Sequence, residues 1–144
     1  MLRISRVHHE EVIAHCQSRY PKEACGLLAG ALAGAPAGAQ AAEAPTVVQV
    51  YPMINVEDSP IGYSMDPKEQ LQVEKQMRQL GQRLLGIYHS HTATDAYPSP
   101  VDIRLSISPD VSYVLVSLKD RQQPVLKSYR IDGAVVKTEE VQVL

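Results

Sequence analysis

The stretch GIYHSHTATDAYPSPVD, residues 86–102, decides the fold of this chain. It begins as an apolar run that ends in two histidines one residue apart, His89 and His91. After a loop, residues 99–102 read Ser-Pro-Val-Asp, which is typical of a helix start because Ser favours the cap position and Pro the first helical position. Histidine and carboxylate side chains hold zinc in sites that keep one position open for water. The stretch therefore predicts a strand, a loop and a helix that meet at a metal site.

The two histidines and an aspartate form the predicted ligand set. Side chains alternate along a strand, so His89 and His91 project to the same side. Asp102 is the favoured third ligand because it lies in the first turn of a helix, where a ligand is better fixed than on a loop. Asp95, on the loop, is the competing third ligand. The alternatives without a metal are a hydrogen-bonded histidine pair on a sheet face and an ordinary capping box from Ser99 to Asp102.

Hydrolysis at such a site also needs a base and a hydrogen-bond donor. Zinc brings the pKa of a bound water toward neutrality, but another group must take the proton and return it to the leaving amine. Glu23 precedes the apolar stretch over 25–30 and is the candidate for this general acid/base, with an ordinary surface glutamate as the alternative. Ser99 is the candidate donor of a hydrogen bond to the developing oxyanion.

The composition indicates one cytoplasmic domain over residues 1–144 and excludes several classes of protein. The formal net charge is −2 and no Lys/Arg cluster is present, so we expect no nucleic-acid partner. No apolar run is long enough to span a membrane, and the N-terminus lacks the apolar core of a signal peptide. Two cysteines, Cys16 and Cys25, are too few for a disulfide framework and are expected to be buried.

Apolar periodicity and turn residues predict the order β-α-β-β-α-β-(α)-β-β-β. Ser5 caps a first helix over 6–19, and Asp66-Pro67 opens a second helix that runs to about Arg83. Strands are predicted at 2–5, 25–30, 46–53, 84–91, 112–119, 125–131 and 134–143. The fold class is therefore α/β, a mixed and mainly antiparallel sheet flanked by helices.

Two further features supply none of the predicted site residues, and the role of the first is left open. Residues 31–44 are rich in Ala, Gly and Pro without a period, and we expect a flexible loop. His8, His9 and His15 fall in the first helix, where we expect solvated or capping histidines.

The spacing Glu23 … His89-x-His91-x7-Ser99-x-x-Asp102 resembles the motif of the JAMM (MPN-plus) zinc metallopeptidases. The resemblance covers nearly the whole chain. It implies one zinc ion per chain, held by His89, His91 and Asp102. It also implies that Glu23 is the general acid/base, that Ser99 stabilises the tetrahedral intermediate, and that the fold is similar to that of cytidine deaminases.

The chain looks like the small prokaryotic members of this family. It lacks the long insertions of the eukaryotic deubiquitinating members, and Thr92 stands where the family usually has proline. The resemblance implies a peptidase or isopeptidase that cuts after the C-terminal diglycine of a ubiquitin-like or sulfur-carrier protein. The alternatives are a non-catalytic MPN-type interaction module and a zinc peptidase of another pathway. The sequence leaves open the leaving group, a homodimer and the need for an activating partner.

Overall fold

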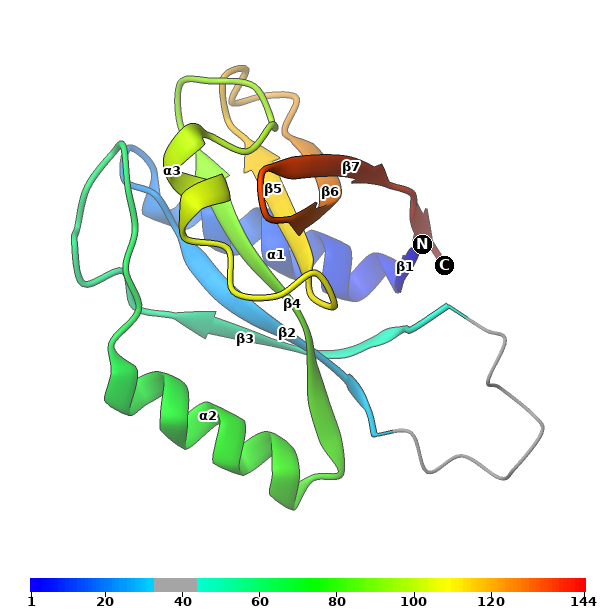
Figure 1. Cartoon of the computed structure of the whole chain (residues 1–144). Helices are drawn as coiled ribbons and strands as arrows, with labels where there is room; N and C mark the ends of the chain where they lie inside the picture. Colours follow the sequence, from blue (N-terminus) through cyan, green and yellow to red (C-terminus); the bar gives the residue numbers. More distant parts are fainter. Residues whose placement is uncertain (33–43) are drawn as a thin grey trace.

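The computed structural model describes residues 1–32 and 44–144 (Figure 1). The helices are α1 (Arg6–Arg19), α2 (Pro67–Gln79) and α3 (Pro100–Arg104). The strands are β1 (Leu2–Ile4), β2 (Cys25–Ala31), β3 (Val47–Met53), β4 (Gln82–His91), β5 (Ser112–Ser117), β6 (Val125–Asp132), β7 (Val135–Glu139) and β8 (Val141–Val143). Most of the predicted loop over 31–44 lies outside the described residues, and Ala31 is the last residue of β2.

Six strands form the main sheet in the order β3-β2-β4-β5-β6-β7. Only the neighbours β4 and β5 run parallel, and the other four pairs are antiparallel. The predicted mixed, mainly antiparallel sheet is therefore confirmed. β1 and β8 form a separate parallel pair beside it (Figure 1).

The two faces of the sheet carry separate apolar cores. Val12 and Cys16 of α1 pack with Leu28 and Tyr88 on one face. Met77 of α2 packs on the other face, with a partly buried isoleucine of α3 beside it. Since side chains alternate along β4, His89 and His91 lie on the face that carries α2 and α3. The candidate site is therefore on the side of the sheet opposite α1.

Two predicted element boundaries are wrong. The second helix ends at Gln79, before the predicted Arg83, because Gly81 adopts a φ of 68° and the chain turns directly into β4. The predicted strand over 134–143 is two strands, β7 and β8. The chain leaves the main sheet at Glu140, whose carbonyl accepts from the Leu2 amide at 2.8 Å, and β8 then pairs with β1.

The face behind the histidines is held by a hydrogen bond that the sequence did not predict. His15 was expected to be solvated or capping, but it is half-buried and its Nδ1 lies 2.7 Å from the Tyr88 hydroxyl. The Tyr88 ring covers Gly26, where an added Cβ would come within 2.3 Å of the ring. The contact therefore ties α1 to β4 at the residue before His89. Cys16 and Cys25 are free and buried, as predicted.

Among the described residues, no helix combines the length and apolar character needed to cross a membrane.

Candidate metal centre

His89 and His91 end β4, which lies between β2 and β5. Backbone pairing on both sides fixes the strand, with Cys25 of β2 and Leu115 of β5 opposite His89. Both histidines are buried, and their Nε2 atoms lie 3.2 Å apart. The alternation expected from the sequence therefore brings both rings to one point.

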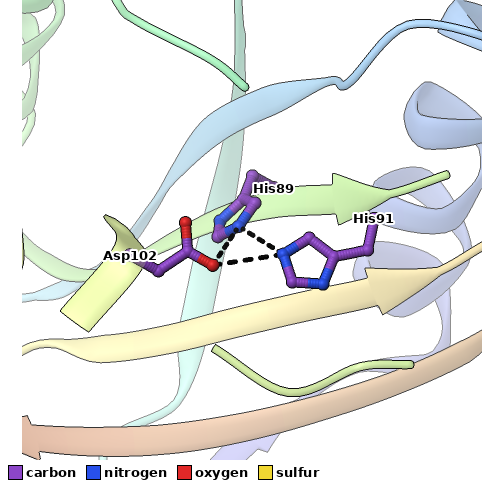
Figure 2. Close-up of side chains that lie close together, drawn as sticks. All are labelled: His89, His91 and Asp102. Atoms are coloured by element: carbon purple, nitrogen blue, oxygen red, sulfur yellow. Dashed lines mark hydrogen bonds and ion pairs between the residues drawn. The ribbon is translucent and has the colours of Figure 1, made fainter. Parts of the chain in front are cut away.

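Asp102 comes from α3 and joins the two histidines (Figure 2). Its Oδ2 lies 3.2 Å from Nε2 of His89 and 3.1 Å from Nε2 of His91. Ser99 caps α3 in a reciprocal capping box: its Oγ accepts from the Asp102 amide at 3.1 Å, and its own amide donates to Asp102 Oδ2 at 2.8 Å. The capping box and the histidine cluster are thus one structure, in which the cap fixes the carboxylate.

Two contacts orient the imidazole rings. His91 Nδ1 lies 3.0 Å from the carbonyl oxygen of Asp95, which can only accept, so Nδ1 carries the hydrogen and Nε2 is left to face the cluster. The ring of Tyr63 stacks on the ring of His89, with centroids 4.5 Å apart and planes 28° apart. The carboxylate of Asp95 does not join the cluster; it is exposed and lies 3.5 Å from Lys119 Nζ.

The charges in this cluster favour an ionised carboxylate. Burial alone would raise the pKa of Asp102, but hydrogen bonds from His89 and His91 outweigh it and hold this pKa well below its usual range. Burial lowers the pKa of His89. Burial acts the same way on His91, but its bonds to Asp102 and to the Asp95 carbonyl raise its pKa.

These three residues fit a zinc ion. Among the described residues they form the group of His, Cys, Asp and Glu side chains whose ligand atoms converge. Two imidazoles and one carboxylate are a donor set that catalytic zinc sites use. Zinc bonds of about 2.0–2.2 Å in a tetrahedral arrangement place the ligand atoms about 3.3–3.6 Å from one another, slightly more than the observed separations of 3.1–3.2 Å.

Glu23 lies two residues before β2, beside this cluster. It is 6% exposed and lines the same groove as the two histidines and Asp102, which encloses about 660 Å³. Burial raises the pKa of Glu23 to about 7, with the charge of Asp102 adding to the rise and that of His91 opposing it. Ser99 lines the groove as well. The structure therefore brings all five predicted site residues to one groove.

Sequence reasoning missed one wall of this groove. Residues 55–64, which we call the strap, lie outside every helix and strand that the sequence predicts. The strap supplies Glu57, Pro60, Ile61 and Tyr63 to the groove, and Ile61 is 89% exposed. No periodicity marks such a segment, because its conformation comes from single hydrogen bonds of the backbone and of side chains rather than from a repeating ladder.

The fold and the donor set together define a class: a mixed α/β protein with a candidate His-His-Asp metal site at the end of a central strand. The chain belongs to the family described as prokaryotic homologs of the JAB domain, which it matches over residues 5–132. This match confirms the predicted resemblance to the JAMM/MPN proteins.

Individual proteins similar to this chain are consistent with this family assignment. A CysO-cysteine peptidase of Mycobacterium tuberculosis (strain H37Rv) is 43% identical over 127 residues, which cover 88% of this chain and 80% of that protein. A probable TtuB-protein conjugate cleaving protease of Thermus thermophilus is 38% identical over 96 residues, or 66% of this chain and 56% of that protein. The solution structure of a Desulfitobacterium hafniense protein superposes with a TM-score of 0.85 at 41% identity, covering 100% of this chain and 93% of that one.

Proposed function

We propose that this chain is a zinc-dependent peptidase and isopeptidase that hydrolyses the bond after the C-terminal diglycine of a ubiquitin-like or sulfur-carrier protein. The observation that carries the proposal is the His89–His91–Asp102 triangle in a groove that also holds the buried carboxyl group of Glu23. The names of the relatives, a CysO-cysteine peptidase and a protein conjugate cleaving protease, support a substrate of this kind.

In this proposal His89, His91 and Asp102 hold one zinc ion per chain. When bound, the ion would act as a Lewis acid that lowers the pKa of a coordinated water and polarises the carbonyl of the scissile bond. The capping box keeps Asp102 in place, and the Asp95 carbonyl keeps His91 in the tautomer whose Nε2 can bind a metal. These residues bind and orient; none of them is free to carry a proton between water and substrate.

Glu23 carries that proton. A pKa of about 7 places the carboxyl group where it can accept a proton from the attacking water and donate it afterwards. The proton then goes to the nitrogen of the leaving amine as the carbon–nitrogen bond breaks, so that the carboxylate is regenerated. The base thus returns to its starting state in each turnover.

Ser99 is proposed to stabilise the negative charge that develops on the substrate oxygen. Its Oγ accepts one hydrogen bond, from the Asp102 amide, and among the described residues its hydroxyl hydrogen has no acceptor. That hydrogen is available to an oxyanion in the groove. A preorganised donor of this kind contributes roughly 10²–10³ in rate.

The groove suits an extended, glycine-rich tail. Pro60, Tyr63, Met65 and Leu105 give it apolar walls, while the cluster and Glu23 supply its polar groups. A tail without side chains can approach the buried cluster closely, and a bulkier residue next to the scissile bond meets these walls. The selectivity for diglycine follows from this close approach.

One experiment tests the proposal. The zinc-loaded protein is incubated with a sulfur-carrier protein whose diglycine tail is fused to a short peptide, and the products are measured by mass spectrometry. We expect cleavage immediately after the second glycine, abolished by a chelator and restored by zinc. A matched substrate ending in Ala-Ala should resist cleavage. Binding of the carrier without hydrolysis in the zinc-loaded protein would instead identify a non-catalytic interaction module.

A further inference from the structure

The strap is closed by a backbone hydrogen bond from the Val56 amide to the Ser64 carbonyl, at 2.9 Å, and by one buried side chain, Asn55, which is 6% exposed. Its Oδ1 accepts hydrogen bonds from the amides of Glu57 at 3.1 Å and Ser64 at 3.0 Å, so it joins the two ends of the strap. Its Nδ2 donates to the carbonyls of Gly62 and Glu23, both at 3.0 Å. All four hydrogen-bonding positions of the amide are therefore used.

The bond to Glu23 matters because Glu23 lies outside the sheet. β2 begins at Cys25, and the first backbone contact of this segment with β4 is between Ala24 and Ser90. The amide of Glu23 instead donates to the carbonyl of Ser59, at 2.9 Å, and its carbonyl accepts from Asn55. Both backbone polar groups of Glu23 are thus bonded to the strap.

The rest of the strap is fixed against the metal side of the groove. Thr92, the residue after His91, donates from Oγ1 to the carbonyl of Pro60 at 3.0 Å. Tyr63 stacks on His89. Asn55 therefore connects the backbone that carries Glu23 to a segment that is itself anchored at both histidines.

We propose that Asn55 is a positioning residue for Glu23: through its side-chain amide it holds the backbone of Glu23 in register with the His89–His91–Asp102 cluster. Its importance for turnover rests on the function proposed above, whereas its effect on the Glu23 backbone does not. A base displaced by about 1 Å loses about two orders of magnitude in rate, so this one amide sets the efficiency of proton transfer without touching substrate.

Asn55→Asp separates this role from general stability. The carboxylate keeps an oxygen that can accept from Glu57 and Ser64, so the strap retains its own closure. It loses the donor to Glu23 and Gly62 and places an anion against two carbonyl oxygens. This is unfavourable at about pH 7.5, where a carboxylate is ionised.

Asn55→Ala, which removes both kinds of bond, is the second variant. Ser108→Ala, which removes a similar side-chain to backbone bond at Asp110, is the control.

The first measurement is amide hydrogen exchange by NMR in the metal-free protein. We expect the Glu23 amide to exchange at least about tenfold faster in Asn55→Asp than in wild type, because its bond to Ser59 opens when the segment is released. The Ala24 amide, which donates to Ser90 Oγ at 2.8 Å, is the internal reference and should keep its protection. Ser108→Ala should leave both amides unchanged. An unchanged Glu23 amide in both Asn55 variants overturns the proposal.

The second measurement is turnover of the diglycine fusion by the zinc-loaded variants. We expect kcat of Asn55→Asp to fall about 10- to 100-fold while KM stays within about twofold, because the substrate is bound as before and only the base is displaced. In a Glu23→Gln background the same substitution should cause no further loss, since the group that it positions is already gone. Equal losses in the two backgrounds, or a loss of bound zinc in Asn55→Asp, would overturn the proposal. If the wild-type protein cleaves no diglycine fusion, the proposed function fails, and the exchange of the Glu23 amide still decides whether Asn55 holds this backbone.

Discussion

The two ends of the groove are built in different ways. At the metal end, His89, His91 and Asp102 lie close together in the sequence, and a strand, a loop and a capping box are enough to make them converge. At the base end, Glu23 lies two residues before β2, outside the sheet, and its backbone is held by the strap through Asn55 and Ser59. The proposed ligands are thus fixed by local regular structure, whereas the proposed base is fixed by tertiary hydrogen bonds. The difference teaches that metal binding and proton transfer can be lost separately.

The largest effect on zinc binding and hydrolysis should follow from substitutions of the proposed metal ligands. We expect His89→Ala and Asp102→Asn to lose the bound zinc and all measurable hydrolysis, because each removes one of three ligands. Asp102→Asn is the sharper variant, since an amide oxygen can still accept from the Ser99 amide and the helix cap survives. Metal analysis and circular dichroism provide the measurement. One zinc per chain in folded Asp102→Asn would remove this residue from the ligand set.

Breaking the base end should leave the metal in place. Glu23→Gln removes the proton acceptor but not a ligand, so we expect one zinc per chain and a fall in kcat of roughly 10²–10⁴. Glu57→Gln is the matched control, because Glu57 also lines the groove but is exposed, and its loss should be far smaller. Kinetics and metal content are measured on the same samples. Equal losses in both variants would mean that the groove needs negative charge rather than a base at position 23.

The stacking of Tyr63 on His89 links the strap to the metal end. Tyr63→Leu removes the ring that holds the imidazole, and we expect zinc affinity to fall about 10-fold, as for other residues that orient a ligand. Tyr63→Phe keeps the ring and should stay within about twofold of wild type, since among the described residues the Tyr63 hydroxyl has no hydrogen-bond partner. Competition with a chromogenic chelator gives both affinities. A similar fall in Tyr63→Phe would show that the hydroxyl, not the stack, matters.

The raised pKa of Glu23 predicts a pH effect on stability. Burial raises this pKa from 4.5 to about 7, so between these values the folded state holds a proton that the unfolded chain releases. The free energy of unfolding of the metal-free protein should therefore fall as pH rises from about 4.5 to about 7, by up to about 3 kcal/mol, and then level off. Glu23→Gln should lose this slope and be more stable than wild type at about pH 8. Urea titrations at several pH values test this, and a parallel slope in both proteins would contradict it.

How far the sequence predicts the molecule follows the same division. His89, His91 and Asp102 could be grouped because alternation along a strand and the signature of a helix cap are local rules. Glu23 could be named from the residues only as a candidate base, and the resemblance to a family motif then supported it, since no local rule places the start of β2 beside the end of β4. The observed pairing of Cys25 in β2 with His89 in β4 brings these two strand ends together.

The features that escaped prediction depend on contacts between distant residues. The sequence of α1 gives His15 the pattern of a surface residue, but in the structure it lies within hydrogen-bond distance of the Tyr88 hydroxyl of β4. Asn55 and Tyr63 lie in a segment without a period, and each contacts a residue far away in the sequence, Glu23 for Asn55 and His89 for Tyr63. The predicted strand over 134–143 looked continuous because β-branched residues run through it, but its last residues form β8, which pairs with β1 and not with the main sheet. Each case is tertiary pairing that overrides a local pattern.

The smallest effect is expected at Thr92, where the strap meets the metal end. Its Oγ1 donates to the Pro60 carbonyl, a bond that the proline usual at this position in the family could not make. Thr92→Val keeps the shape of the side chain and removes the hydrogen bond, so we expect the free energy of unfolding to fall by about 0.5–1 kcal/mol. We also expect KM to rise about twofold at unchanged kcat, because one wall of the groove is loosened while Asn55 still holds Glu23. Thr92→Ser retains the hydroxyl and should resemble wild type in both measurements. A fall in kcat in Thr92→Val would mean that the bond from Thr92 to the strap, as well as Asn55, positions Glu23. The metal end and the base end of the groove would then depend on each other more than their separate contacts indicate.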